Sequence, residues 1–228
     1  LSVSSLARLW FISFLLSSGL LSIVNSGTNI WQFISFYSLS ETSITNEMLQ
    51  KTFQEGKIIS VVTNTALAIG ALTIGILSDN LNKKQICGYL CLVAILAGLA
   101  LQFVSSFVLF LFFITVCALC LGGGISIVFT IGSTLFRRRD IVTVNSVITS
   151  SYCAGIIFSA IVIYSTRHSF VALPFEVVNK NGISSNILEL SDFGMIYIIS
   201  TAFCSLALLI LLLWKDYCEN KAKKMVIT

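Results

Sequence analysis

Residues Asn25 to Asn29 of this chain read Asn-Ser-Gly-Thr-Asn, and they interrupt a long apolar run that covers residues 9–24 and 30–37. Amide and hydroxyl groups are costly in hydrocarbon unless they face other protein groups or a watery cavity. These groups carry no charge, and they donate and accept hydrogen bonds that suit a neutral or zwitterionic organic solute. The run therefore predicts a solute-binding site near the midpoint of a membrane span.

Other uncharged polar residues recur at helical spacing, because residues at i, i+4 and i+7 share one face of a helix. The same spacing relates Asn25, Asn29 and Gln32, then Ser60 and Asn64, then Asn145, Thr149 and Tyr152. The predicted solute site comprises Asn25, Thr28, Asn29, Gln32, Asn64, Gly122, Gly123, Asn145, Thr149 and Tyr152. The alternative is that Asn64 or Asn145 only holds helices together by hydrogen bonds.

The composition places these residues in a membrane protein. The chain has 228 residues, of which 56% are hydrophobic and 11% are charged, whereas a soluble domain has about 25% charged residues. A helix needs about 20 apolar residues to cross the hydrocarbon core. We therefore expect an all-α, multi-pass bundle over residues 1–228, with spans at about 9–38, 58–77, 86–104, 107–136, 143–164 and 193–214. The first and fourth are long enough to be tilted, to be broken or to extend past the membrane.

Basic residues predict the orientation of these spans. One side carries most of the Lys and Arg, at positions 8, 83–84, 137–139 and 215–224. The positive-inside rule puts this side, both termini and a basic tail at 215–228 in the cytoplasm. The loops 39–57 and 165–192 then lie on the other side as polar connectors, the first with room for a short surface helix. Since topology explains the net charge of +4, no nucleic-acid partner is expected.

Spans one and four resemble each other, because both are long and both are interrupted centrally. Asn25–Asn29 interrupts the first, and Gly122-Gly123-Gly124 interrupts the fourth. Interrupted helices at corresponding positions of two inverted triplets are typical of a transporter's binding site. We therefore expect spans one to three and four to six to form a 3+3 inverted repeat. The alternative for the glycines is that they allow close helix packing.

The loop between spans two and three carries the strongest local motif, Gly75-Ile-Leu-Ser-Asp79-Asn-Leu-Asn-Lys83-Lys84. We expect Gly75 to allow close packing of span two, and Asp79 to lie just past its end. There Asp79 would accept hydrogen bonds from a helix N-terminus or pair with a basic residue of the next cytoplasmic loop. Lys83 and Lys84 suit lipid headgroups. The alternative is a basic loop that only sets topology. The predicted gating residues are Gly75, Asp79, Lys83, Lys84, Arg137, Arg138 and Arg139.

The motif resembles the loop signature of the major facilitator superfamily, G-x-x-x-D-[RK]-x-G-[RK]-[RK]. Asn80 and Asn82 depart from it, at the positions of a basic residue and a glycine. The six-span layout resembles one half of a 12-helix facilitator, the C-terminal half. Residues 19–31, and residues 122–160 with Phe136, Asn145-Ser146 and Ser151–Gly155, look like the nodulin-like and monocarboxylate-porter-like branch; apicomplexan-type amino-acid facilitators are also similar. The resemblance implies that the loop holds a cytoplasmic gate.

We therefore expect a secondary active or facilitative transporter of a small neutral or zwitterionic solute: a monocarboxylate, an amino acid or a sugar-like molecule. It would work in the lipid bilayer by alternating access against a second six-helix half, in the same polypeptide or a partner chain. The alternative is a non-transporting scaffold or receptor with a relic facilitator fold. An enzyme is not expected, because the chain has no Ser–His pairing, no H-E-x-x-H and no paired intramembrane aspartates. Cys117 and Cys120 form a C-x-x-C without a second pair, so neither a metal nor a cofactor is expected.

Overall fold

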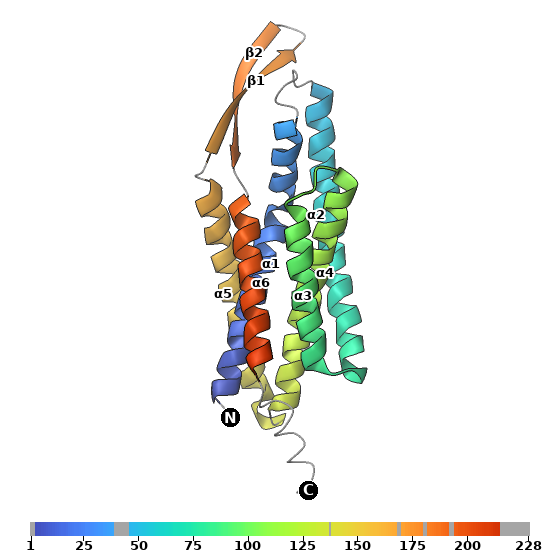
Figure 1. Ribbon diagram of the computed structural model, residues 1–228, viewed down its shortest axis with the longest axis vertical. Helices are drawn as coiled ribbons and strands as arrows, with labels where there is room; N and C mark the ends of the chain where they lie inside the picture. The colour runs from blue at the N-terminus through green and yellow to red at the C-terminus, as the bar shows by residue number, and fades with distance from the viewer. Residues whose placement is uncertain are drawn as a thin grey trace, which may run out of the picture.

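The computed structural model describes residues 3–38, 46–136, 138–167, 170–179, 182–191 and 194–214. Six of its helices are long and apolar enough to cross a membrane, which confirms the prediction of a multi-pass membrane protein. They are α1 (Val3–Ser38), α2 (Asn46–Asn80), α3 (Lys83–Leu101), α4 (Phe107–Leu135), α5 (Ile141–Arg167) and α6 (Gly194–Leu213). Figure 1 shows them as one upright bundle, in which α1 begins and α6 ends at the same end. The predicted basic tail at 215–228 lies outside the described residues.

The two shortest helices set the depth of the membrane. At about 1.5 Å of rise per residue, α3 with 19 residues and α6 with 20 are each about 30 Å long. That length matches the hydrocarbon core of a bilayer, which is about 30 Å thick. The two helices pack side by side, and a Cβ built on Gly98 of α3 would meet Thr201 of α6 at 3.0 Å. The centre of α6, near Phe203, therefore serves as the reference level for depth along the bundle.

The packing of the bundle is interleaved rather than sequential. The main partners of α1 are α5 and α6, and those of α4 are α2 and α3. The two long helices α1 and α4 also contact each other, and α3 packs against α6. By contrast, α3 barely contacts α1 or α2, although it follows them directly in the chain. The apolar core lies between these helices and includes Ile12, Leu20 and Ile114, each almost fully buried.

Small residues at mid-depth let the backbones approach closely. A Cβ built on Gly70 of α2 would overlap the carbonyl oxygen of Leu119, and one built on Gly155 of α5 would overlap Oγ of Ser17. Neither contact leaves room for a methyl group. Close approach through small residues is the common way for membrane helices to associate, because lipid gives no hydrophobic drive between helices. These glycines therefore fix α2 against α4 and α5 against α1.

Two expectations about helix continuity are wrong. Both α1 and α4 run without a break, through Asn25–Asn29 and through the three glycines. A helix satisfies its own backbone groups, so polar side chains and glycines need not interrupt it. In addition, α2 begins at Asn46, within the loop that was expected to be a connector with a short surface helix. Figure 1 shows α1 and α2 extending past the other helices at the end opposite the chain's start.

The second long loop also differs from the expected connector. Phe170–Asn179 (β1) and Gly182–Ser191 (β2) form an antiparallel hairpin, with Phe170 opposite Ser191 and Asn179 opposite Gly182. The expectation of an all-α chain thus holds for the six spans and not for this loop. The hairpin stands at the end of the bundle where α5 stops and α6 starts (Figure 1).

Candidate functional site

Polar side chains of α1 and α2 gather beside the contact between the two helices. Asn25, Asn29 and Gln32 share one stripe of α1, and Ser60 and Asn64 share one stripe of α2; together we call them the α1–α2 polar stripe. Asn25, Ser60 and Asn64 are exposed, whereas Asn29 and Gln32 are half-buried. Gln32 borders the contact directly, because its Nε2 would lie 3.8 Å from a Cβ built on Gly56. The structure thus brings the predicted residues of spans one and two together.

Two hydrogen bonds hold this part of α1 to α2. Thr28 Oγ1 donates to the carbonyl oxygen of Gly56 at 3.2 Å, and Trp31 Nε1 donates to Oε2 of Glu55 at 2.7 Å. Thr28 therefore has a packing role beside the stripe. The bond between Trp31 and Glu55 was not foreseen, because Glu55 lay in the expected connector. The acidic residues between 46 and 57 were a signal that this segment leaves the hydrocarbon.

Along α1, the stripe lies beyond the level of the centre of α6. Gly19 of α1 packs at the centre of α6, since its Cβ would lie 3.3 Å from Cβ of Phe203. At about 1.5 Å per residue, Asn25 lies about 9 Å and Asn29 about 15 Å further along α1. The placement of a solute site near the midpoint of the span stays a prediction, and on this scale Asn29 lies near the outer end of the core set by α6. Ile59 of α2 faces Gly27 of α1. Because α2 runs back toward the end where α1 starts, Asn64, more than a turn after Ile59, lies closer to the centre of the bundle than Asn25.

The predicted residues of α5 form a separate group. Trp10 Nε1 of α1 donates to Oγ of Ser150 at 3.1 Å, so Thr149 and Asn145 lie at or beyond the level of Trp10. Asn25 is about 22 Å further along α1 in the opposite direction. Thr149 Oγ1 donates to the carbonyl oxygen of its own helix at Asn145, at 2.8 Å. The structure therefore does not join these residues, or the half-buried Tyr152, to the α1–α2 polar stripe.

Gly122 and Gly123 of α4 are buried against α2. A Cβ on Gly122 would overlap the carbonyl oxygen of Leu67, and one on Gly123 would lie 2.6 Å from Cγ1 of Ile74. Nearby, Ser126 Oγ donates to the carbonyl oxygen of Ala71 at 2.9 Å. Of the two interpretations of these glycines, these contacts support helix packing.

The loop between α2 and α3 differs from its expected arrangement. Nothing lies within 4 Å of a Cβ built on Gly75, so the expectation that this glycine allows close packing is wrong. Asp79 lies in the last turn of α2, which ends at Asn80, rather than past the helix end. The predicted pairing of its side chain with Arg137 or Arg138 lies outside the described residues and side chains. Arg139 is exposed in the short 3-10 helix Arg138–Asp140 (η1).

Asn82 and Lys84, at the start of α3, both have hydrogen-bond partners. Asn82, which departs from the family motif, caps α3 by accepting a hydrogen bond from the backbone nitrogen of Lys84 at 3.2 Å. Asn is among the residues that favour this position. The Nζ of Lys84 donates to the carbonyl oxygen of Trp214, directly after α6. Lys84 thus ties the start of α3 to the end of α6, while Lys83 is half-buried at the same helix start.

The described residues contain no group of three or more His, Cys, Asp or Glu that suits a metal ion. Cys117 and Cys120 are free thiols in the core, as are Cys87, Cys91 and Cys204. Cys153 of α5 is also free but is exposed. What the arrangement offers chemically is uncharged hydrogen bonding along the α1–α2 polar stripe. No protein-family model matches the chain, and a search of curated proteins found no match to it.

Proposed function

We propose that this chain is one six-helix half of a transporter of the major facilitator type, which moves a neutral or zwitterionic organic solute by alternating access. The observation that carries the proposal is the exposure of the Asn25 and Asn64 amides at the depth of the hydrocarbon. An amide whose polar atoms lack partners costs several kcal/mol in lipid, and for Asn64 the bond from its Nδ2 to the carbonyl oxygen of Ser60 at 2.8 Å offsets only part of that cost. A second half, with a watery path between the halves, would remove that cost.

The contrast between the two faces of α2 supports this proposal. Asn64 and Ser60 lie on one face, whereas Ile58, Ile69 and Ile76 lie about 120 to 140° further around the helix and are 45%, 49% and 70% exposed. The apolar face suits lipid, and the polar face does not. In a membrane, polar residues almost always face the bundle interior or a water-filled cavity. The face with Asn64 is therefore the one that we assign to the solute path.

The packing also fits an inverted repeat of α1–α3 and α4–α6. The contacts of α1 with α5 and α6 correspond to those of α4 with α2 and α3. Between the two long helices the contacts are reciprocal: Gly27 of α1 faces Ile114, and Gly124 of α4 faces Leu16. Such exchange of partners is what a two-fold axis in the membrane plane would produce, and inverted repeats of this kind are common in transporters.

Solute binding is tested with the full-length product in detergent, against amino acids, sugars, monocarboxylates and nucleosides. A ligand that binds the folded state raises the melting temperature by mass action. We expect a selective shift that the double variant Asn25→Leu/Asn29→Leu removes, together with uptake. The matched control is Thr65→Leu, since Thr65 is a polar residue among the exposed apolar residues of α2. This variant should leave the melting-temperature shift and the uptake unchanged.

Two outcomes would count against the proposal. Normal uptake by the double variant, at wild-type expression, would contradict the assignment of the α1–α2 polar stripe to the solute path. No shift across the panel and no uptake would favour a scaffold or receptor with a relic facilitator fold. The use of Lys84 as a link between α3 and α6, rather than at a gate, is the observation that favours this second candidate.

A further inference from the structure

A groove of about 460 Å³ runs between α3 and α6, at the end of the bundle where α3 begins and α6 ends. Ligand sites commonly measure roughly 300–1,000 Å³. Residues three and four apart share a helix face, and each helix turns one such face to the groove. These residues are Gln85, Gly88, Tyr89 and Leu92 on α3, and Leu208, Leu211 and Leu212 on α6. Tyr89 and Leu212 are 68% and 67% exposed, so this α3–α6 groove opens toward lipid.

The groove is polar at the membrane edge and apolar further in. Asn82 caps α3 and Lys84 lies in its first turn, at the edge of the core that α3 spans. Tyr89 and Leu92 lie about 8 and 12 Å deeper than Lys84, at about 1.5 Å per residue. On α6, the bond from Lys84 to the Trp214 carbonyl marks the same edge, and Leu208 lies about 9 Å deeper. This order of polar and apolar groups is that of a phospholipid, whose headgroup precedes its acyl chains.

Lys84 gives the polar end of the groove a positive charge. Its ammonium has three donors, of which one goes to the carbonyl oxygen of Trp214. No carboxylate lines the groove among the residues that the structure describes. Asn82 and Gln85, which line the groove beside Lys84, carry exposed amides that donate neutral hydrogen bonds. These groups suit a phosphate and favour a headgroup with a net negative charge.

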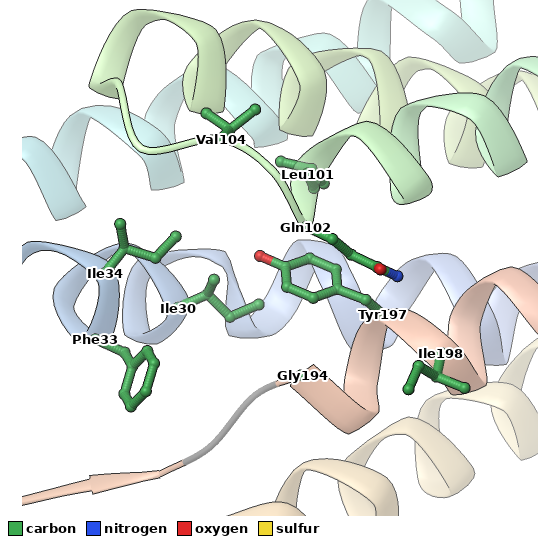
Figure 2. A pocket seen from close by; sticks show the side chains of 9 residues that line it. All are labelled: Ile30, Phe33, Ile34, Leu101, Gln102, Val104, Gly194, Tyr197 and Ile198. Atoms are coloured by element: carbon green, nitrogen blue, oxygen red, sulfur yellow. The ribbon is translucent and has the colours of Figure 1, made fainter. Parts of the chain in front are cut away.

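The space at the opposite end of the same two helices lacks this charge. Figure 2 shows that space, of about 310 Å³, with Tyr197 of α6 and Gln102 after α3 among its lining side chains. None of the described residues that line it is a Lys or an Arg. The charge is therefore specific to the end of the bundle that the distribution of Lys and Arg predicts to be cytoplasmic. Anionic lipids are concentrated in the cytoplasmic leaflet.

We propose that the α3–α6 groove binds a phospholipid whose headgroup carries a net negative charge. Lys84 donates to the phosphate, and one acyl chain lies over Gly88 toward Leu92. A Cβ built on Gly88 would meet side-chain carbons of Leu211 at 3.6 Å and Leu208 at 3.9 Å, so the missing side chain leaves a floor on which the acyl chain packs. The lipid links α3 to α6 beside the bond from Lys84 to Trp214, separate from the α1–α2 polar stripe.

The test measures binding of radiolabelled dioleoyl phosphatidylglycerol to the purified full chain in detergent micelles. We expect saturable binding, for which dioleoyl phosphatidylcholine competes about fivefold more weakly. Its phosphate and acyl chains are the same, but its choline brings a positive charge toward Lys84. Lys84→Met should weaken binding of phosphatidylglycerol about fivefold. The matched control is Lys83→Met, which removes the same charge from a neighbour that is not among the lining residues and should leave binding within about twofold of the wild type.

Two further measurements separate lipid recognition from the fold. In Lys84→Met the preference for phosphatidylglycerol over phosphatidylcholine should disappear, whereas loss of the bond to Trp214 alone would weaken both lipids equally. Gly88→Trp should block both lipids by filling the groove. Its fold should persist, because the added Cβ meets only ordinary contacts and glycine is a poor helix former; the melting temperature without lipid checks this. Ile157→Trp on α5, where Ile157 is 63% exposed, is the control.

The proposal is overturned if Lys84→Met keeps the wild-type preference for phosphatidylglycerol, or if folded Gly88→Trp binds this lipid like the wild type. Equal competition by glycerophosphoglycerol, which lacks acyl chains, would show an anion site in which the apolar walls have no role, and this too would overturn it. Dimers of the chain that Gly88→Trp dissociates, without saturable lipid binding, would assign the groove to a second copy instead. None of these outcomes depends on whether the chain transports a solute.

Discussion

The indole Nε1 of Trp31 donates a hydrogen bond to the carboxylate of Glu55 at 2.7 Å, which ties α1 to α2 where both leave the hydrocarbon. The ring of Trp31 also contacts α4, with its centroid 5.1 Å from that of Phe107 and 5.3 Å from that of Phe110. One side chain, 5% exposed, therefore joins three helices beside the α1–α2 polar stripe. It fixes the position of α2 against α1 at the depth where the stripe begins.

Replacing this indole should weaken the fold. We expect Trp31→Phe to lower the free energy of unfolding by about 2 kcal/mol, because a hydrogen bond to a charged group is lost. Glu55→Gln keeps an acceptor oxygen and should cost about half as much. Reversible unfolding in mixed micelles measures both. Wild-type stability of both variants would show that the bond contributes nothing.

Alanine substitutions at one glycine of the predicted site and one of the predicted gate should change the stability of the protein in opposite directions. Gly122→Ala places a methyl group against the Leu67 carbonyl oxygen, and we expect a loss of about 3 kcal/mol or more through overpacking. Gly75→Ala meets open space inside a helix and should stabilise the protein by up to about 1 kcal/mol. Melting temperatures of the two variants give the comparison. Equal effects would contradict the packing described for α2 and α4.

The link between α3 and α6 should depend on one of two adjacent lysines. Lys84→Met removes the donor to the Trp214 carbonyl and should cost about 1 kcal/mol, a charged hydrogen bond at a half-exposed site. Lys83→Met is the control and should stay within about 0.5 kcal/mol of the wild type. Thermal unfolding distinguishes them. A larger loss of stability for Lys83→Met than for Lys84→Met would mean that contact with headgroups, expected for both lysines, outweighs the bond to Trp214.

Asp79 carries a prediction that depends on the proposed transport function. An acidic residue in the last turn of α2 is at the negative end of the helix dipole, so Asp79→Asn should raise stability by about 0.5 kcal/mol. If Asp79 acts at a gate, the same variant should alter the transport rate more than the apparent solute affinity. Initial uptake rates over a range of solute concentrations separate kcat from KM. An unchanged rate would remove Asp79 from the gate.

The fourth and sixth spans were predicted most accurately, and the predicted 107–136 agrees with α4 (Phe107–Leu135) to one residue. Residues 193–214 were predicted and α6 covers Gly194–Leu213, because hydrophobicity reports burial in lipid directly. The start of α2 was missed by twelve positions, 58 against Asn46. Between them lie Glu47, Lys51 and Glu55, which are polar because this part of the helix extends into water. Hydrophobicity cannot distinguish such a helical extension from a loop.

The hairpin was missed for a different reason. The Asn181-Gly182 dipeptide is a signal of a hairpin, but Pro174 argues against a strand. An edge position accommodates proline, since each strand of a two-stranded sheet has one unpaired edge. The separation of Asn145 and Thr149 from the polar stripe needed tertiary contacts. Helical spacing relates residues within one helix and carries no information on the level at which two helices meet.

The interleaved packing has a consequence for the order in which the protein assembles. When α3 has just been made, the helices available to it are α1 and α2, which it barely contacts in the finished bundle. The close contacts of Gly70 and Gly98 wait for Leu119 and Thr201, which are synthesised later. Apart from the contact between α1 and α2, the first three helices must therefore stay inserted without their main partners until the last three arrive. Assembly of this bundle is a late, non-local event, and premature termination after Leu101 would leave three helices without their partners.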